Sequence, residues 1–394
     1  MSASLSFRTN VGNLGKLPEL FHYSESNMVN SDKSNTYQEA FRDPERVRQL
    51  AACIRRELSA PITLMEVCGT HTMSVHRFGL RDLLPRDLKL LSGPGCPVCV
   101  TPNTYYEQVR LLAQNPDLAL CSFGDLLRVP GRDGSLEDLR AGGADVRVVY
   151  SPAQALEFAL ADPMKKYVFL GIGFETTAPL TAAVIQSAQK GHCGNFFVLS
   201  GHKTMPPPMR ALVESGEVAI DGFLCPGHVS VITGDAPYRF LAEEKGKPCL
   251  IAGFEPVDVL QGLLMLIRQR NEGRSEVEIQ YTRAVRPDGN PNARELMQRI
   301  FCESDDDWRG LGRIPLSGLR IREEYTAYDA AQLVPPVEIP PEDLSGCICH
   351  KILRGIALPN ECALFGEICV PNRPRGACMA SQEGTCSIYY RYGR

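Results

Sequence analysis

The chain has 394 residues, of which 44% are hydrophobic and 22% charged, so it has enough apolar material for the packed cores of two or three domains. Its formal charge of −4, from 42 basic and 46 acidic residues, favours neither a nucleic acid nor an anionic membrane as a partner. No apolar run approaches the roughly 20 residues of a membrane span, and the polar N-terminus lacks the order of a signal peptide, so we expect a cytoplasmic protein.

The N-terminal stretch is rich in Asn, Ser and Lys and shows little periodicity, which predicts a loose extension over residues 1–37. The first helix is predicted to begin at Asp43 and Pro44, because a capping side chain followed by proline is typical of a first helical turn. Apolar residues then recur at helical spacing as far as Leu58.

Strand and helix signals alternate after this first helix. Short apolar runs end in Gly-rich turns, and Ser151-Pro152 and Thr177 with Pro179 mark the starts of two of the helices that follow them. This order predicts parallel sheets covered on both faces, with enough units for two doubly wound, Rossmann-like α/β domains. The predicted strands are 62–67, 88–91, 118–120, 146–150, 167–172, 196–199, 220–224 and 249–252.

Two proline pairs mark the last boundary. Pro335-Pro336 and Pro340-Pro341 cannot continue a helix or a central strand, so they predict a linker into a separate module. We therefore expect an extension (1–37), a first α/β domain (38–155), a second α/β domain (156–330) and a C-terminal Cys-rich module (331–394). The tripeptide Gly-Phe-Glu follows a predicted strand in both halves, at residues 173–175 and 253–255.

The chain contains 15 cysteines, and six of them fall in the last 48 residues. In a reducing compartment such clustering indicates metal, iron–sulfur or redox chemistry rather than structural disulfides. Six other cysteines stand singly and are expected to be small buried hydrophobic residues: Cys53, Cys121, Cys193, Cys225, Cys249 and Cys302.

The tail thiols are spaced irregularly among many Gly and Pro residues, unlike the paired units of a zinc ribbon. So few apolar residues cannot order some fifty residues alone, whereas a bound metal or cluster would supply the missing stabilisation. A four-iron cluster takes four thiolates, which leaves a spare pair, Cys349 and a later cysteine, able to form a disulfide beside it. The alternative is a purely structural zinc or cluster knot. The six thiols are Cys347, Cys349, Cys362, Cys369, Cys378 and Cys386.

Two thiol motifs occur early in the chain. Cys68 follows the strand 62–67 and precedes a helix, where backbone N–H groups favour a thiolate. For His71 three interpretations are open: a metal donor, a base, or a structural residue held by a hydrogen bond. Cys96 and Cys99 form a Cys-x-x-Cys motif between a strand and a helix, which is typical of thioredoxin-like redox pairs but equally able to bind metal.

Three further polar residues sit at predicted strand ends and are candidates for a functional role. Glu175 ends a Gly-x-Gly turn that lacks the third glycine of a dinucleotide loop, so it is either functional or a helix cap. His202 and His228 lie on two further turns. In open α/β sheets ligands collect at the carboxyl ends of strands, where these residues and both thiol motifs are predicted to lie.

Five strings then stand in a fixed order from about residue 40 to the C-terminus. They are Cys68-Gly-Thr-His-Thr72, Gly93-Pro-Gly-Cys-Pro-Val-Cys-Val-Thr-Pro102, Gly173-Phe-Glu-Thr-Thr-Ala-Pro179, Pro226-Gly-His-Val-Ser230 and the six-Cys tail ending in Glu383-Gly-Thr-Cys386. Together they resemble the HypD family of nickel–iron hydrogenase maturation proteins. The extension has no counterpart in the family's core, and His350 stands where the family commonly has glycine.

The resemblance implies assembly of the Fe(CN)2CO unit of the hydrogenase active site, together with the small partner HypC and the cyanide donor HypE. It implies that Cys68 ligates a mononuclear iron, carried as cargo with its cyanide and CO, jointly with a cysteine of HypC and with His71 close by. It also implies that Cys96 and Cys99 are a redox-active dithiol. The tail would carry a 4Fe–4S cluster with an adjacent redox pair, as in ferredoxin–thioredoxin reductase: Cys347, Cys362, Cys369 and Cys386 for the cluster, Cys349 and Cys378 for the pair.

Two other functions fit the same residues. A standalone iron–sulfur-dependent thiol–disulfide oxidoreductase would use Cys96 and Cys99 on a protein substrate and would not need Cys68. In a third interpretation Cys68, Cys96 and Cys99 are three ligands of a substrate-binding cluster, as in hydro-lyases. We favour the assembly scaffold, because thiolates suit a low-spin iron that bears cyanide and CO better than carboxylates do.

Overall fold

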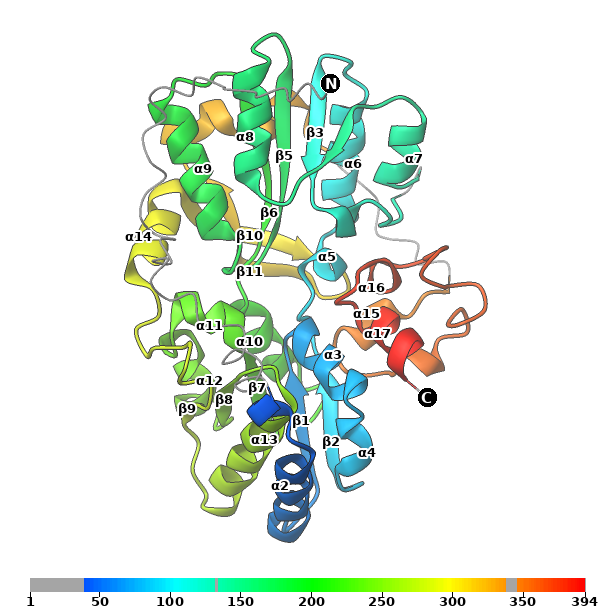
Figure 1. Ribbon diagram of the computed structural model, residues 1–394, viewed down its shortest axis with the longest axis vertical. Coiled ribbons are helices and arrows are strands. Elements are labelled where there is room, and N and C mark those ends of the chain that lie inside the picture. Colours follow the sequence, from blue (N-terminus) through cyan, green and yellow to red (C-terminus); the bar gives the residue numbers. More distant parts are fainter. Residues whose placement is uncertain (1–38, 132–133, 338–345, 394) are drawn as a thin grey trace, which may run out of the picture.

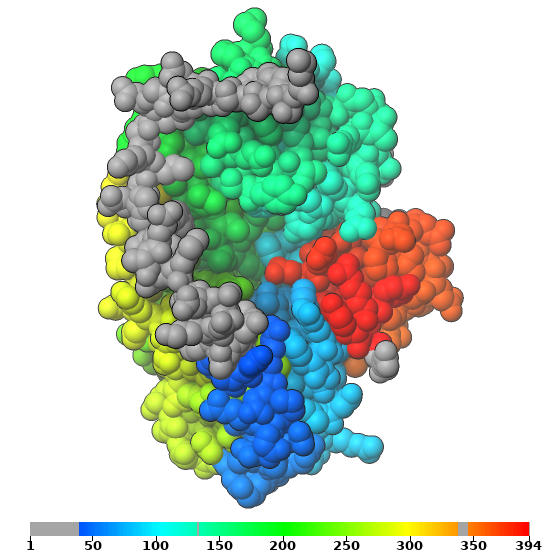
Figure 2. All heavy atoms as spheres, viewed as in Figure 1, coloured from blue at the N-terminus to red at the C-terminus, as the bar shows by residue number. Residues whose placement is uncertain are grey.

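The computed structural model describes residues 39–131, 134–337 and 346–393, so the predicted extension and Pro340-Pro341 lie outside the described residues. Two α/β lobes are stacked along the long axis of the molecule, and the Cys-rich tail packs against its side at the waist between them (Figure 1). The same arrangement is visible in the space-filling view, where the tail, in red and orange, contacts both lobes (Figure 2).

The lower lobe is built on a five-stranded parallel sheet with the order β2-β1-β7-β8-β9. Alternate strand residues face two different cores: Leu64 and Leu224 pack toward α2 and α13, whereas Met65 and Phe223 pack on the opposite face. The strands are Ile62–Glu66 (β1), Leu88–Ser92 (β2), Gly222–Pro226 (β7), Cys249–Ala252 (β8) and Val277–Ile279 (β9). The helices of this lobe are Pro44–Glu57 (α2), Gly69–Arg77 (α3), Leu80–Leu83 (α4), Pro206–Ser215 (α10), Gly227–Thr233 (α11), Arg239–Glu243 (α12) and Pro256–Asn271 (α13).

The upper lobe is built on a four-stranded parallel sheet with the order β4-β3-β5-β6. Tyr167 and Phe169 face α8 and α9, and Val168 and Leu170 face the core that continues through the waist. The strands are Leu118–Ser122 (β3), Val146–Val148 (β4), Lys166–Gly173 (β5) and Phe196–His202 (β6). The helices are Asn103–Ala113 (α6), Leu136–Ala141 (α7), Pro152–Ala161 (α8) and Ala178–Lys190 (α9), with Pro291–Ile300 (α14) packed on α9.

The predicted α/β class is confirmed, and all eight predicted strands are present within one to three residues of their expected bounds. Helices begin at Pro44 and Pro152 as predicted, each capped by the side chain of the preceding residue. Of the single cysteines, four are buried as expected, whereas Cys53 and Cys302 are only partly buried.

The predicted division of the chain between residues 155 and 156 needs correction, because it runs through the upper sheet. β5 pairs with β3, which precedes the expected boundary, and β7 pairs with β1 across more than 150 residues of chain. The chain leaves the lower lobe after β2 and returns to it after β6. Local sequence signals predict where each strand lies along the chain but not which strand it pairs with. The two passages of the chain between the lobes were therefore not predictable.

An antiparallel hairpin, Phe301–Trp308 (β10) and Gly312–Ile321 (β11), extends from the upper lobe toward the waist. The sequence analysis missed it because β10 is acidic rather than apolar. The buried Lys203, at the end of β6, forms an ion pair with Asp306 of the hairpin and donates a 2.9 Å hydrogen bond to the Asp307 carbonyl. This pairing ties the hairpin to the strand at which the chain crosses back to the lower lobe.

In the part of the tail that the structure describes, the α-helices are short: Cys349–Ile352 (α15), Ala377–Ala380 (α16) and Thr385–Tyr392 (α17). Its buried residues do not form a core of their own but join the apolar cluster that runs through the waist, together with Met65 and Leu170. α17 packs on α3, where the Tyr389 ring lies against His76 at a tilt of 51° with 4.3 Å between ring centroids and accepts a 2.5 Å hydrogen bond from Arg81. Docking onto the lower lobe therefore accounts for much of the order of this module.

Candidate functional site

Cys68 lies on the turn between β1 and α3, where it caps the first turn of the helix. The exposed fraction of the whole residue is 9%, and Cys68 is buried. Burial and the nearby Glu383 carboxyl raise the pKa of the Cys68 thiol to about 12, and the backbone N–H groups of Thr70 and His71 partly oppose this rise. The thiol is therefore protonated at neutral pH until a cation replaces its proton.

Two carboxyl groups that the sequence analysis did not single out flank Cys68. Glu66, at the end of β1, is buried, and its carboxyl accepts a 3.2 Å hydrogen bond from the Cys68 N–H and another from the Thr72 hydroxyl. Burial raises the pKa of Glu66 to about 8. Glu383 reaches the turn from the tail and accepts a 3.3 Å hydrogen bond from the Thr70 hydroxyl; burial also raises its pKa. Such acids suit a site that takes up a cation.

The turn that carries the Cys-x-x-Cys motif touches the Cys68 turn directly. β1 and β2 are parallel and paired from Ile62 with Leu88 to Glu66 with Ser92, so the turns that follow them emerge at the same edge of the sheet. The Gly69 N–H donates a 3.2 Å hydrogen bond to the Gly95 carbonyl. A Cβ atom on Gly95 would lie only 2.3 Å from the Cys68 nitrogen, so only glycine permits this approach.

Cys96 and Cys99 are joined by a disulfide across the first turn of Pro97–Val100 (α5). The exposed fractions of the two residues are 4% and 0%. Both sulfur atoms face the tail: Cys96 Sγ lies 3.4 Å from the Ser381 hydroxyl, and Cys99 Sγ lies 3.9 Å from the Ala377 carbonyl oxygen. The disulfide is thus enclosed between the Cys68 turn and α16.

All six tail thiols line one cavity, together with Ile352, Phe365, Gly376 and Met379. A Cβ atom on Gly376 would lie 3.1 Å from Cys347 Sγ and 3.9 Å from Cys349 Sγ, so a glycine opens the wall at this point. Cys378 belongs to α16, the helix that contacts the disulfide. Within the described parts of the chain, no three His, Cys, Asp or Glu residues are grouped about a position for a single metal ion.

The thiols of the cavity affect one another electrostatically. The Cys347 thiol, followed by burial, raises the pKa of Cys349, and burial followed by the Cys347 charge raises the pKa of Cys378 to about 12. Burial, with neighbouring thiols adding to it, also raises the pKa of Cys386. A positively charged group in the cavity would relieve this repulsion, so the donor set fits a metal cluster chemically.

Arg309, at the tip of the β10–β11 hairpin, connects the two thiol sites. Its N–H donates a 2.8 Å hydrogen bond to the Val100 carbonyl, directly after Cys99, and its guanidinium contacts the Asn103 side chain at 2.5 Å. The positive charge of Arg309 acts to lower the pKa values of Cys349 and Cys378, against the larger effects that raise them. Local sequence signals did not reveal this residue, because the hairpin reaches the site only in the folded chain.

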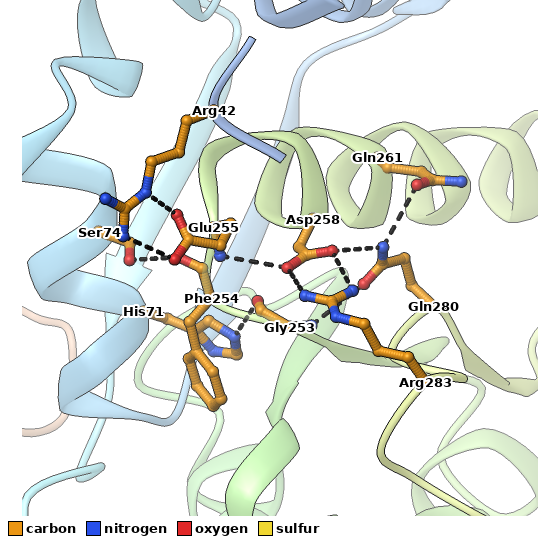
Figure 3. A network of polar contacts seen from close by, with 10 residues as sticks. All are labelled: Arg42, His71, Ser74, Gly253, Phe254, Glu255, Asp258, Gln261, Gln280 and Arg283. Atoms are coloured by element: carbon orange, nitrogen blue, oxygen red, sulfur yellow. Dashed lines mark hydrogen bonds and ion pairs between the residues drawn. The ribbon is translucent and has the colours of Figure 1, made fainter. Parts of the chain in front are cut away.

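His71 and His228 lie on either side of Phe254, whose ring stacks on both, with centroid distances of 4.8 Å and 4.0 Å. His71 is fully buried and bonds through Nε2 to the Gly253 carbonyl at 3.0 Å, as Figure 3 shows. Burial lowers the pKa of His71 to about 4, so it is neutral at physiological pH. The fold thus brings together two motif histidines that lie 157 positions apart in the sequence.

The other two candidates lie in the upper lobe. Glu175 accepts a 2.9 Å hydrogen bond from the Met205 N–H, and burial raises its pKa to about 7. His202 Nε2 lies 3.0 Å from the Thr181 hydroxyl, and burial lowers its pKa to about 4. Among the described residues, no hydrogen bond or ion pair joins either side chain to Cys68, Cys96 or Cys99. The structure therefore gathers Cys68, His71, Cys96, Cys99 and the tail thiols, whereas Glu175 bonds to the N-cap residue of α10 and His202 bonds to α9.

Comparisons with known proteins agree with the motifs. Residues 45–393 match the model of the HypD family, described as a hydrogenase formation family. The chain belongs to the HypD family. It is 48% identical over 368 residues to hydrogenase maturation factor HypD2 of Bradyrhizobium diazoefficiens, a match that covers 91% of this chain and 97% of that protein. It is 42% identical over 360 residues to hydrogenase maturation factor HypD of Escherichia coli K12, with 89% and 96% covered.

The predicted family is therefore confirmed, and with it a role as a hydrogenase maturation factor. Among the described residues there is no helix with the length and apolar character that a membrane span requires.

The contact at Gly95 leads to a test of stability. We expect Gly95→Ala to destabilise the fold by about 1–3 kcal/mol, as overpacking against backbone atoms does, because the added carbon meets the main chain at Val67 and Cys68. Thermal unfolding of the two proteins measures the effect. Gly194→Ala is the matched control, since a Cβ atom there meets nothing within 4 Å. Equal unfolding temperatures for Gly95→Ala and the wild type would contradict the close approach.

Proposed function

We propose that this chain is the scaffold on which the Fe(CN)2CO unit of a nickel–iron hydrogenase is assembled. Cys68 holds the iron jointly with a cysteine of a small HypC-type partner, and a HypE-type partner supplies cyanide. One observation carries the proposal: Cys68 adjoins the turn of the Cys96–Cys99 disulfide, and that disulfide adjoins the helix that carries Cys378 in the six-thiol cavity. A cargo site and an internal redox chain are thus continuous in space.

The surroundings of Cys68 suit an iron that carries strong-field ligands. Sulfur is a soft donor, and low-spin iron with cyanide and CO favours such donors over carboxylates. Iron binding removes the thiol proton and places positive charge beside Glu66 and Glu383, which both become easier to ionise. Because Cys68 keeps an exposed fraction of 9%, a partner can supply a second thiolate from the solvent side.

The tail cavity suits a resident 4Fe–4S cluster, held by Cys347, Cys362, Cys369 and Cys386, with Cys349 and Cys378 as the adjacent redox pair. Thiolates are the usual ligands of such clusters, and the six that line this cavity provide four ligands and two further thiols. The Arg375 N–H donates a 3.2 Å hydrogen bond to Cys369 Sγ, which stabilises a thiolate at that position. When bound, the cluster supplies electrons one at a time.

Reduction of the Cys96–Cys99 disulfide consumes two electrons and two protons and yields two thiols. Cys349 and Cys378 can store a pair of electrons as thiols and release them by forming a disulfide with each other. Cys378 lies on α16 between Ala377, which contacts Cys99, and Ser381, which contacts Cys96. Reducing equivalents then need to cross only one short helix to reach the turn beside Cys68.

The alternative of a standalone thiol–disulfide oxidoreductase fits the geometry less well. Attack on a disulfide requires that the incoming thiolate reach one of its sulfur atoms. Cys96 and Cys99 have exposed fractions of 4% and 0% and are covered by α16, so a folded protein substrate has no direct approach to them. The third interpretation, a substrate-binding cluster held by Cys68, Cys96 and Cys99, needs Cys96 and Cys99 as free thiolates. In this structure these two residues are joined by a disulfide.

The experiment that tests the scaffold is infrared spectroscopy of the chain purified as a complex with its HypC-type partner. We expect cyanide and CO stretching bands in the wild-type complex and their loss in Cys68→Ser, because oxygen replaces the soft donor that holds the iron. Cys53→Ser, a partly buried single cysteine on α2, is the control and keeps the bands. Full bands in Cys68→Ser, or none in a loaded wild-type complex, would contradict the proposal.

The position of Arg309 leads to a second test. In Arg309→Gln the positive charge that acts on Cys349 and Cys378 is lost, while a polar side chain remains beside Asn103. Reduction adds negative charge, so we expect the midpoint potential of the tail centre to fall in Arg309→Gln and to stay near the wild-type value in Arg309→Lys. A redox titration followed by electron paramagnetic resonance measures it. Equal midpoint potentials in the wild type and both variants would show that the charge of Arg309 does not influence the tail centre.

A further inference from the structure

The tip of the β10–β11 hairpin, residues 308–310, contacts both thiol sites. On one side the Arg309 N–H donates a 2.8 Å hydrogen bond to the Val100 carbonyl, at the end of the helix that carries the disulfide. On the other side a Cβ atom on Gly310 would lie 2.8 Å from the Cα atom of His350, the second residue of α15. The hairpin tip therefore touches α5 and α15, the two helices on which thiols of the proposed redox chain begin.

A two-stranded ribbon is only marginally stable by itself, so the position of its tip depends on contacts from outside the ribbon. Two turns of the upper sheet supply such contacts. β5 and β6 are parallel and paired as far as Gly173 with His202, so the residues that follow them, Phe174 and Lys203, emerge together at the carboxyl edge of the sheet. Both side chains are buried, and both meet the hairpin.

Lys203 fixes the strand β10 close to the tip. Its exposed fraction is 1%, and a buried ammonium group is stable only where an opposite charge and hydrogen-bond acceptors surround it. Asp306 supplies the charge in an ion pair, and the Asp307 carbonyl accepts a 2.9 Å hydrogen bond from Nζ. A Cβ atom on Gly318, in the facing strand, would lie 2.7 Å from the Cβ atom of Asp306, so this glycine makes room for the pairing. Any shift of β10 would leave the buried charge unpaired.

Trp308, the residue directly before Arg309, is held by contacts with both turns. Its ring stacks on Phe174 with 5.9 Å between the ring centroids and 16° between the planes, and the Lys203 ammonium lies 5.3 Å from the Trp308 ring centroid. The indole N–H donates a 2.8 Å hydrogen bond to the Ser317 hydroxyl. Stacking and a cation above the ring add to the stabilisation that burial of the indole provides. The main chain that leads into Arg309 is therefore fixed.

We propose that Lys203 and Phe174 are positioning residues of the redox chain, because they hold the hairpin so that Arg309 lies between the Cys-x-x-Cys segment and α15. The inference rests on the proposed function, which assigns electron transfer to the thiols on both sides of the tip. It gives a role to the Gly-Phe-Glu turn at residues 173–175 and to the turn after β6. The carboxyl edge of the upper sheet supports the redox chain through the hairpin, as the carboxyl edge of the lower sheet supports the two thiol turns.

The first experiment needs neither cluster nor partner, because Trp308 is the single tryptophan of the chain. In Lys203→Met the hairpin loses its ion pair. We therefore expect acrylamide to quench the fluorescence of Trp308 severalfold more strongly than in the wild type, with emission at longer wavelength, as the indole becomes accessible. Phe174→Leu, which removes the stacked ring but no charge, is expected to change both quantities in the same direction.

Arg313→Met is the matched control for the fluorescence experiment. Arg313 faces the same acidic strand, but its side chain is 65% exposed and lies 3.9 Å from the carboxylates of Asp305 and Asp307. Exposed pairs of this kind contribute little, so we expect wild-type quenching in this variant. Wild-type quenching in both Lys203→Met and Phe174→Leu would overturn the anchoring of the hairpin.

The second experiment measures the midpoint potential of the tail centre in the cluster-loaded chain. Phe174→Leu alters no charge, and we expect the potential to fall as in Arg309→Gln but by less, because Arg309 is displaced rather than removed. In the double variant we expect no fall beyond that of Arg309→Gln alone, since both changes act through one side chain. An unchanged potential in Phe174→Leu, or additive falls in the double variant, would overturn the inference and leave the proposed function standing. A wild-type chain without a reducible tail centre would instead contradict the proposed function, while the quenching of Trp308 decides the anchoring by itself.

Discussion

The contact between Gly95 and the backbone of Cys68 is the constraint on which the site depends. It arises because β1 and β2 are parallel neighbours in register, so their carboxyl ends deliver two turns to one place on the sheet edge. Any side chain at position 95 would separate the turns, and with them the cargo thiol from the disulfide. The second lobe and the tail then close over this pair of turns, so that one apolar cluster encloses Cys96, Cys99 and most of the tail thiols.

Burial dominates the electrostatics of the site. It raises the pKa values of Cys68, Glu66 and Glu383 and lowers that of His71, so burial favours the neutral forms of all four groups. Removing charge from water is costly unless an opposite charge arrives, and in the proposed function that charge is an iron cation. The same balance holds in the tail, where thiols that repel one another surround a cavity and Arg309 supplies a permanent positive charge.

The tail carries the six-thiol cavity and also forms part of the wall around Cys68. Glu383 contacts the Cys68 turn, Ser381 contacts Cys96, and Tyr389 is held between His76 and Arg81 of the lower lobe. A Cβ atom on Gly69 would meet Glu383 at 2.5 Å, so this interface is as close as that between the two turns. Loss of order in the tail is therefore expected to alter the surroundings of Cys68 as well as the redox chain.

The amino-acid sequence by itself determined the α/β class, the eight strands and the family, because hydrophobic period, turn residues and motif spacing are local properties of the chain. It did not reveal the interleaved lobes, the acidic β10–β11 hairpin, or the contacts that Glu66 and Arg309 make beside the thiols. The Gly-Phe-Glu repeat shows the difference: Glu175 binds the backbone N–H of Met205, the N-cap residue of α10, whereas Phe254 stacks on two histidines of the lower lobe. Only the tertiary structure decided these contacts, because a local pattern states what a residue can do, and packing between distant segments decides which partner it meets.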